Sequence, residues 1–438
     1  WLAAAVSLCS APLAASLGAP PELNGLDALY PQLERLYIDL HQNPELSLQE
    51  EKTAAKMAAQ LRAAGFEVTE RVGGLGVVGV LRNGDGPTVL IRTDMDALPV
   101  KEQTDLPYAS AAVGRNDAGD TVPLMHACGH DAHMAAWVGA ANLLVQSKDR
   151  WQGTLVFVGQ PAEEIVQGAA RMVSDGLLTR FPKPDFVIGI HVSNLMPAGC
   201  VGIVAGPASA ACDSVDITFY GKGGHGAMPH RTVDPLVIAA GAVGALQTIV
   251  SREVDPFDAA VVTVGVFQAG SKRNVIPDEA TLRLTVRSYK PEVQQRLLAS
   301  IERIAKGEAA AGGAPREPLV TVISAESSDV VVNDPALAGR LMSALQRALG
   351  DQNVIIAQPV MTSEDFGVYG MAASAPAIQF RIGAVEAELF ADAKASGRAL
   401  MLPGPHSPLF APDPEPTIKA GAAAFTLSVT ELLGKPAD

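Results

Sequence analysis

Residues 154–190 read TLVFVGQPAEEIVQGAARMVSDGLLTRFPKPDFVIGI, and this stretch predicts the fold class. An apolar, β-branched run at 154–158 is followed by a helical pattern near 169–178 and by a second apolar run at 186–190. Strands that alternate with helices in this way form largely parallel sheets whose faces the helices cover. The stretch therefore predicts an α/β fold with a mostly parallel central sheet flanked by helices.

Strand and helix patterns continue on both sides of this stretch. Two apolar runs at 77–81 and 88–91 are separated by the turn signal NGDG, which predicts a hairpin or neighbouring strands of one sheet. Another strand-like run occupies 377–381. Apolar residues recur at helical spacing in further segments, at 33–40, 54–64, 133–146, 335–349 and 417–433. Most of the chain is therefore predicted to build one helix-covered sheet.

The order of the patterns changes between residues 209 and 324. There the chain runs strand, helix, strand, strand, helix, strand, at 214–220, 235–250, 261–267, 280–286, 293–304 and 319–323. This order is typical of a ferredoxin-like split unit. We therefore predict a small ferredoxin-like α+β domain, 209–324, inserted into a larger α/β domain that consists of 21–208 and 325–438.

Composition excludes several classes of protein. The chain has 438 residues, of which 48% are hydrophobic and 18% charged, so it can bury a large core and is not intrinsically disordered. Asp and Glu number 47 against 33 for Lys and Arg, which gives a net charge of -14. Nucleic-acid binding by a broad basic surface is therefore disfavoured.

The first twenty residues have the composition of a targeting segment. No charged residue precedes Glu22, and residues 2–19 are rich in Ala and broken by Pro12. An apolar run followed by small residues is typical of a secretory signal, so we predict a signal-peptide remnant at 1–20, with cleavage after Ala15 and a periplasmic or secreted mature protein. The alternative is an apolar tail of a cytoplasmic protein. No membrane span is predicted in the mature chain.

Cysteine and histidine gather in one segment, MHACGHDAHM, from Met125 to Met134. In an exported protein Cys200 could pair with Cys212, and Cys9 would leave with the signal, so Cys128 would be the odd thiol. Cys128 and His130 are two residues apart at the start of a predicted helix, where a thiolate and an imidazole can turn toward one ion. Taken alone, such a segment is more often a structural or redox feature than a catalytic site.

Three further segments place metal-binding residue types at predicted strand ends or in a rigid loop. The segment VGQPAEE covers the end of a predicted strand and carries the adjacent carboxylates Glu163 and Glu164. These are either the solvated start of a helix, or a metal ligand (Glu164) beside a general base (Glu163). His191 lies in GIHV at another strand end, where a buried core histidine is the simpler interpretation. His406 lies in the loop PGPHSP. Four independent segments that supply these groups together favour metal catalysis.

With these motifs, the chain resembles the M20 metallopeptidases, specifically the amidohydrolase branch that includes hippurate hydrolases and auxin-conjugate hydrolases. The resemblance covers nearly the whole mature chain. It is carried by MHACGHDAHM, GQPAEE, GIHV and the His406 loop, and by LHQNPELSLQE (40–50), RTDMDALPV (92–100), GKGGHGAMPH (221–230), NVIPD (274–278) and MTSEDF (361–366). So many ordered motifs make the resemblance specific.

The resemblance implies a site for two divalent ions, Mn²⁺ or Zn²⁺. The implied ligands are Cys128, His130, Glu164, His191 and His406, with the Cys128 thiolate bridging the ions where other branches use a carboxylate. Glu163 is implied as the general base that takes a proton from the activated water, and Asp96 as the acid that orients a ligand side chain. Asp94 occupies the place of a ligand histidine in other branches, so it is predicted not to be a ligand.

The resemblance also assigns roles to the inserted segment. It implies a lid or dimerisation domain, through which the chain would form a homodimer, and in which His225 helps to stabilise the oxyanion. Asn274 and Arg287 are candidates for holding the carboxylate of the substrate, with Arg287 as an ordinary exposed strand residue as the alternative.

The implied function is hydrolysis of the amide bond of N-acyl amino acids or short dipeptides, which yields a carboxylic acid and a free amino acid. A metallo-carboxypeptidase, dipeptidase or deacetylase of the same family is the nearest alternative. A non-catalytic binding protein is the competing class, which an intact Glu163 disfavours.

Overall fold

The alternation of strands and helices produces an eight-stranded sheet in the order β1-β2-β6-β3-β7-β18-β8-β17. At its centre β6, β3, β7 and β18 run parallel to one another, while β1, β2 and β8 provide antiparallel pairs nearer the edges. The strands span β1 (Glu67–Val72), β2 (Gly76–Asn83), β3 (Thr88–Asp94), β6 (Gly153–Gln160), β7 (Phe186–Pro197), β8 (Val201–Ile203), β17 (Val354–Ile356) and β18 (Ala377–Val385). The predicted α/β fold with a mostly parallel central sheet is therefore confirmed.

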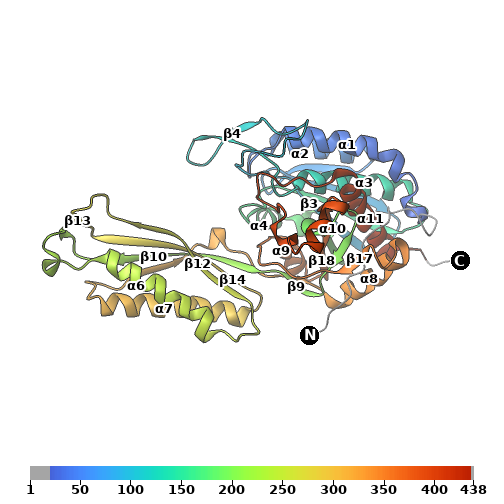
Figure 1. Cartoon of the computed structure of the whole chain (residues 1–438). Helices are drawn as coiled ribbons and strands as arrows, with labels where there is room; N and C mark the ends of the chain where they lie inside the picture. The colour runs from blue at the N-terminus through green and yellow to red at the C-terminus, as the bar shows by residue number, and fades with distance from the viewer. Residues whose placement is uncertain (1–19, 436–438) are drawn as a thin grey trace. The chain divides into compact units, whose positions relative to one another are not determined.

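This sheet belongs to the larger of two units into which the chain divides (Figure 1). The computed structural model describes residues 20–435. Unit 1 holds the described residues up to Ala208 together with Val332–Pro359 and those from Asp365 onward, and unit 2 holds Ser209–Val331 and Val360–Glu364. The signal-peptide prediction falls on residues 1–20, of which 1–19 lie outside the described part.

The helices of unit 1 cover both faces of its sheet. They span α1 (Leu26–Gln42), α2 (Glu51–Ala63), α3 (His130–Gln146), α4 (Gly168–Ser174), α5 (Leu177–Arg180), α8 (Pro335–Leu349), α9 (Gly367–Ala373), α10 (Ala387–Ala395) and α11 (Pro414–Leu433). One hydrophobic cluster joins α1, α2, α3, α8 and α11 to alternate strand residues such as Ile188 and Ile190. Gly189 faces the opposite side, where a Cβ would meet the Phe366 ring next to α9.

The strands β4, β5, β9 and β16 lie outside the large sheet. A two-stranded ribbon consists of β4 (Val113–Arg115) and β5 (Thr121–Pro123). The strands β9 (Gly206–Ser209) and β16 (Val331–Asn333) contain residues at which the chain passes from one unit to the other.

The predicted hairpin of 77–81 with 88–91 is wrong. These runs form β2 and β3 of the same sheet, but β6 lies between them, antiparallel to β2 and parallel to β3. The NGDG segment therefore connects strands that are not neighbours. The pairing depends on a strand that begins at Gly153, about 60 residues later in the chain, and local turn chemistry does not report such a long-range partner.

Unit 2 contains a four-stranded antiparallel sheet in the order β12-β14-β10-β15. Its main elements are β10 (Ala211–Tyr220), α6 (Pro235–Thr248), β12 (Ala260–Ala269), β14 (Glu279–Ser288), α7 (Pro291–Ala311) and β15 (Leu319–Val322), with a small ribbon of β11 (Gly224–His225) and β13 (Val275–Ile276). Strand residues that alternate inward, such as Ile217 and Leu282, pack against α6 and α7 in a second core. Unit 2 therefore has a hydrophobic core of its own.

Helix α6 is unusually apolar. It begins at Pro235, with the Asp234 carboxylate accepting a hydrogen bond from the Leu236 amide at 3.0 Å as the N-cap. Residues 235–253 form a stretch as long and as apolar as a membrane span, and a third of it is buried inside the protein. The buried side, which includes Ile238 and Leu246, contributes to the core of unit 2, as the core helix of a globular domain does.

Candidate metal centre

The ends of the central parallel strands bring chemically active residues to one edge of the sheet. Asp94 is the last residue of β3, Glu163 and Glu164 follow the end of β6, and His191 lies in β7. Ligands of open α/β sheets bind at this carboxyl edge because the loops that follow neighbouring parallel strands meet there.

Cys128 and His130 reach the same edge because of the turn that starts α3. Gly129 between them has φ +77, and a Cβ at this position would come within 2.7 Å of a Val192 methyl. Only glycine adopts this left-handed conformation without strain in so little space. The turn therefore places the thiol and the first imidazole of α3 beside the end of β7.

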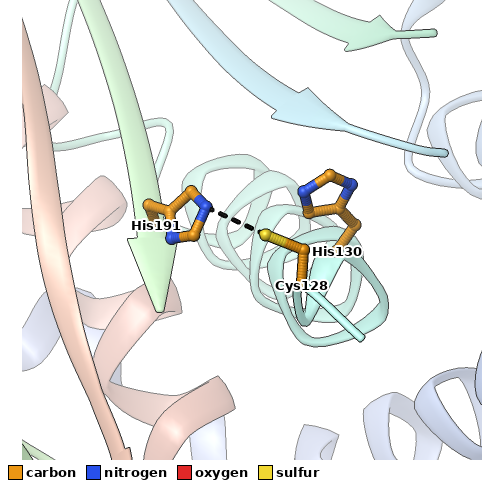
Figure 2. Close-up of side chains that lie close together, drawn as sticks. All are labelled: Cys128, His130 and His191. Atoms are coloured by element: carbon orange, nitrogen blue, oxygen red, sulfur yellow. Dashed lines mark hydrogen bonds between the residues drawn. The ribbon is translucent and has the colours of Figure 1, made fainter. Parts of the chain in front are cut away.

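One candidate ligand group consists of Cys128, His130 and His191 (Figure 2). One possible ligand atom from each lies within 4.8 Å of the others. The Cys128 sulfur is 3.5 Å from Nε2 of His191. The Nδ1 of His191 is 2.8 Å from the Val192 carbonyl, to which it must donate, so the Nε2 lone pair faces the sulfur.

A second candidate group consists of Cys128, Glu164 and His406, again within 4.8 Å. The Nε2 of His406 is 3.2 Å from Oε2 of Glu164. The amide of His406, at φ +70, donates to the Ala127 carbonyl at 2.8 Å and fixes its loop against the segment that carries Cys128. Cys128 therefore belongs to both groups, so the structure brings all five predicted ligands together.

Two buried polar atoms at this site lack hydrogen-bond partners among the described residues, namely Nε2 of His130 and Oε1 of Glu164. Nδ1 of His130 lies 2.8 Å from the Asp96 carbonyl, so the neutral ring carries its proton on Nδ1 and presents its lone pair at Nε2. A buried acceptor without a partner is costly unless something binds it. Two imidazoles, a thiol and a carboxylate with open lone pairs fit a metal ion.

The electrostatic potential of the site also suits cations. Burial alone would lower the pKa of His130, but the surrounding carboxylates of Asp94, Asp96 and Glu164 raise it to about 10. The negative potential that retains a proton on His130 is the same potential that attracts a divalent ion. At His191, burial and the neighbouring His133 and Arg381 hold the pKa well below the usual value, so this imidazole is neutral and able to act as a ligand.

Glu163 and Asp96, the predicted base and orienting acid, lie beside the same atoms. Glu163 is buried, and its Oε2 is 3.6 Å from Nε2 of His130. The Oδ2 of Asp96 accepts hydrogen bonds from the Ser47 hydroxyl at 2.6 Å and from the Glu164 amide at 2.9 Å. Burial would raise the pKa of Asp96, but the hydrogen bonds, led by that with His130, hold it below its usual value.

Asp94 and His133 have their hydrogen-bonding capacity occupied within the protein. The Asp94 carboxylate binds Nη1 of the fully buried Arg92 at 2.6 Å and Nδ1 of His133 at 2.7 Å. Nε2 of His133 accepts the Val192 amide at 2.8 Å, so neither ring nitrogen presents a lone pair. His133 thus ties β3 to the residue that follows His191, and it differs in this respect from His130 and His191.

The remaining predicted site residues lie in unit 2. His225 and Asn274 are exposed and adjacent, because Gly226 donates its amide to the Asn274 carbonyl at 2.9 Å in the β11–β13 ribbon. Arg287 is partly buried in β14, and its Nη1 donates to the Met361 carbonyl at 2.8 Å. The structure therefore brings His225 and Asn274 together within unit 2. The suggested disulfide between Cys200 and Cys212 does not form, since the Cys212 thiol is free.

Sequence reasoning gave no role to a buried charged network behind the ligand helix. Nδ1 of His41 is 2.7 Å from the Asp131 carboxylate, and Nε2 is 3.1 Å from the Glu102 carboxylate. The rings of Tyr37 and Tyr108 pack around the His41 ring. His41 belongs to the LHQNPELSLQE motif, which was a signal, but its partners are 61 and 90 residues away and no spacing indicates them.

This network predicts a pH-dependent stability. Burial alone would lower the pKa of His41 from 6.5, but the hydrogen bonds that its ring donates to the Asp131 and Glu102 carboxylates raise it to about 10. Because the folded pKa lies above the unfolded one, the stabilisation is fully present below pH 6.5 and is lost as the pH rises through about 10. We expect His41→Gln to lower the free energy of unfolding by about 3–5 kcal/mol near neutral pH.

Urea denaturation of both proteins at about pH 6 and about pH 10 measures the effect. The difference between wild type and variant should shrink at the higher pH. A difference that stays constant would show that a protonated His41 does not provide the stabilisation.

The comparisons with known proteins agree with this geometry. The N-acetylcysteine deacetylase of Bacillus subtilis is 39% identical over 293 residues, 66% of this chain and 74% of the relative. An IAA-amino acid hydrolase of Arabidopsis thaliana is 35% identical over 335 residues, 76% of this chain and 73% of the relative. A crystal structure from Bacillus subtilis, described as a dinuclear metal binding peptidase from the M20 family, has 30% identity and a TM-score of 0.74, covering 93% of this chain and 99% of that one.

The family model gives the same result. Residues 90–394 match the model of peptidase family M20/M25/M40, a range that contains Cys128, His130, Glu163, Glu164 and His191. The predicted resemblance is thereby confirmed, and this chain is a hydrolase that belongs to the peptidase family M20/M25/M40.

Proposed function

We propose that this protein hydrolyses the amide bond of N-acyl amino acids to a carboxylic acid and a free amino acid. The observation that carries the proposal is the pair of ligand groups that share Cys128, with the buried Glu163 carboxylate beside them. Relatives named as a deacetylase of N-acetylcysteine and a hydrolase of an IAA-amino acid support this substrate class.

Two divalent ions would fit the ligand set, with Cys128, His130 and His191 as the residues that would hold one and Cys128, Glu164 and His406 as those that would hold the other. Bound there, they would lower the pKa of a water molecule and polarise the scissile carbonyl. Glu163 then accepts the proton of the attacking water and transfers it to the leaving amine. Asp96 keeps His130 oriented through its backbone carbonyl, which accepts the Nδ1 proton.

The identity of the ions is open between Mn²⁺ and Zn²⁺. A thiolate ligand favours zinc, because a soft sulfur donor binds a softer ion better. Carboxylate and imidazole ligands accommodate either ion. The metal is therefore treated as a variable in the experiment below.

A substrate panel tests the proposal. N-acetyl, N-benzoyl and indoleacetyl amino acids and dipeptides are each assayed with Mn²⁺, Zn²⁺, Co²⁺ and Ni²⁺ separately, with release of the free amino acid as the readout. We expect at least one N-acyl amino acid to be cleaved. Cleavage of dipeptides alone would indicate a carboxypeptidase or dipeptidase, and binding without turnover of any substrate would indicate a binding protein.

For unit 2 we propose a ferredoxin-like lid that supplies substrate contacts. The sheet order and the β-α-β-β-α-β succession of the main elements support the fold. His225 and Asn274 are exposed and close along the backbone, so they suit contacts to the oxyanion and to the substrate carboxylate. Arg287 pairs with Cys212 at the other end of β14 from this ribbon, so it is a separate candidate donor for a carboxylate.

His225→Ala tests the lid. We expect kcat to fall by about 100-fold, because a donor to the developing oxyanion is removed, while the metal content stays unchanged. Elemental analysis and steady-state kinetics measure both quantities. His230→Ala, an exposed histidine of the same motif, is the matched control. Loss of metal without loss of kcat at saturating metal would reassign His225 as a ligand.

We also propose that unit 2 forms the interface of a homodimer. Leu236 and Val237 of α6 are exposed, and so are Val266 and Phe267 on β12, which is an edge strand of its sheet. Exposed apolar side chains on a helix and an unpaired strand edge suit pairing with the same surface of a second copy.

Sedimentation of two variants measures this association. We expect Val237→Glu on α6 to shift the protein from dimer to monomer, because a charge would be buried without a partner. Ala299→Glu, on an exposed position of α7, is the control and should leave the dimer intact. A monomeric wild type would contradict the proposal.

The uncharged, Ala-rich residues 2–19 support the further proposal that the protein is exported. Cell fractionation of the full-length natural protein tests it, and activity confined to the cytoplasmic fraction would contradict it.

A further inference from the structure

The segment His41–Glu50 lies against the metal centre, but the mechanism above gives it no role. Three of its side chains form hydrogen bonds to groups next to candidate ligands. His41 binds Asp131, which follows His130, Ser47 binds Asp96, and Glu50 binds the amide of Ala162. The last two contacts concern the loop that carries Glu163 and Glu164.

That loop, residues 160–168, has an unusual backbone. Ala162 has φ +54 and Val166 has φ +50, which side chains with a Cβ rarely adopt, and a β-branched valine least of all. At the end of the loop Gly168 packs so closely that a Cβ would come within 1.7 Å of the Pro161 carbonyl oxygen. Such conformations persist only where surrounding contacts hold them, and they gather at functional sites.

Glu50 holds the first strained residue directly. Its Oε1 accepts the Ala162 amide at 2.7 Å, and the side chain is completely buried. Its Oε2 has no hydrogen-bond partner among the described residues. Without an acceptor the buried Ala162 amide would be unsatisfied, so the contact with Glu50 favours this loop conformation.

Ser47 acts on the same loop through Asp96. The Ser47 hydroxyl donates to Oδ2 of Asp96 at 2.6 Å, and the same oxygen accepts the Glu164 amide at 2.9 Å. The segment therefore acts on the amides on either side of Glu163 in two ways. Glu50 accepts the Ala162 amide directly, and Ser47 donates to Asp96, which accepts the Glu164 amide.

We propose that Ser47 and Glu50 are positioning residues, which hold the 160–168 loop so that Glu163 faces the reacting water while Glu164 faces His406. This inference rests on the proposed function of Glu163 as general base. It gives the LHQNPELSLQE motif a chemical task. Glu50 accepts the Ala162 amide, and Ser47 supports Asp96, which accepts the Glu164 amide.

The physical consequence concerns turnover more than substrate binding. If the Ala162 amide loses its acceptor, the backbone there can relax to an unstrained conformation and carry Glu163 with it. Displacing a catalytic group by about 1 Å costs on the order of 100-fold in rate. Substrate affinity depends on other side chains and should change little.

Two substitutions of similar volume at Glu50 separate this role from packing. Glu50→Gln retains a carbonyl oxygen that accepts the Ala162 amide, whereas Glu50→Leu fills the space without an acceptor. At saturating metal on the full chain, we expect Glu50→Leu to lower kcat by about 10- to 100-fold with KM within about threefold. Glu50→Gln should stay within about threefold of wild type in both constants. Gln49→Ala, an exposed neighbour, is the control.

Metal content and thermal midpoint are measured on every variant. Equal losses of kcat in Glu50→Leu and Glu50→Gln, or wild-type kcat in Glu50→Leu, would overturn the proposal. If Glu50→Leu does not fold, Ser47→Ala decides the question, because it removes one hydroxyl from a partly exposed position. We expect a fall in kcat of about threefold or more, with unchanged KM and metal content, and an unchanged kcat would overturn the proposal.

The outcome is distinguishable from a failure of the proposed function. If wild type cleaves no N-acyl amino acid, or if Glu163→Gln is fully active, the reaction assignment fails. If wild type is active and Glu163→Gln is not, a normal Glu50→Leu removes the positioning role alone.

Discussion

Replacing Glu163 by glutamine should lower kcat by at least about 100-fold while the protein retains its metal ions. The amide is nearly isosteric with the carboxyl group, so the packing of this buried side chain is preserved. It cannot accept the proton of the attacking water, because an amide is not a base near neutral pH. Steady-state kinetics and elemental analysis on the same sample measure the two quantities.

The neighbouring carboxylate provides the matched control. Glu164, whose Oε2 is 3.2 Å from Nε2 of His406, belongs to a ligand group, so Glu164→Gln should lose metal together with activity. The two adjacent glutamates should therefore respond differently, since Glu163→Gln retains its metal ions and Glu164→Gln loses metal. Near-normal turnover in Glu163→Gln, or equal metal loss in both variants, would remove the distinction between base and ligand.

Replacing Cys128 by alanine should abolish activity and lower the occupancy of both ions. The sulfur belongs to both candidate groups, so its removal takes one ligand from each. Removal of a residue that belongs to only one of the two groups would instead weaken the binding of one ion and leave the other ion in place. The sulfur-to-cobalt charge-transfer absorption of the Co²⁺-loaded protein reports the same contact and should vanish in Cys128→Ala.

Two further variants separate ligand loss from damage to the fold. Cys212→Ala removes the other free buried thiol, which lies in unit 2, and should keep metal and activity. Cys128→Asp replaces the thiol with a carboxylate, another group that binds divalent ions, and should recover part of the metal content. Full metal occupancy in Cys128→Ala would show that the sulfur is not a ligand.

The resemblance implies the five candidate ligands, and the structure places them in two groups that share Cys128. Glu164 follows the apolar strand β6, and His191 lies within β7 rather than at its end. His130 begins α3, and Gly129 separates it from Cys128. Parallel strands bring such positions to one edge of the sheet whatever their distance along the chain. This regularity explains why residues far apart along the chain meet at one edge of the sheet.

The residues that hold the ligands are harder to predict. Arg92 lies within an apolar strand, and nothing local indicates that it binds Asp94 and faces the Asp365 carboxylate at 3.2 Å. The pairing of β2 with β6 fails to follow from sequence for the same reason. Contacts between distant segments depend on how the whole sheet is ordered, and periodicity within one segment carries no information about that order.

The Cys128 sulfur, which belongs to both candidate ligand groups, also affects the order in which metal ions bind to the apoprotein. A thiol must lose its proton to coordinate, and the first cation to arrive drives that loss. The second cation then meets a donor that is already ionised, so the pH dependence of loading falls on the first step. Where the cations bind one after the other, titration of the apoprotein should accordingly release most of its protons before half-saturation.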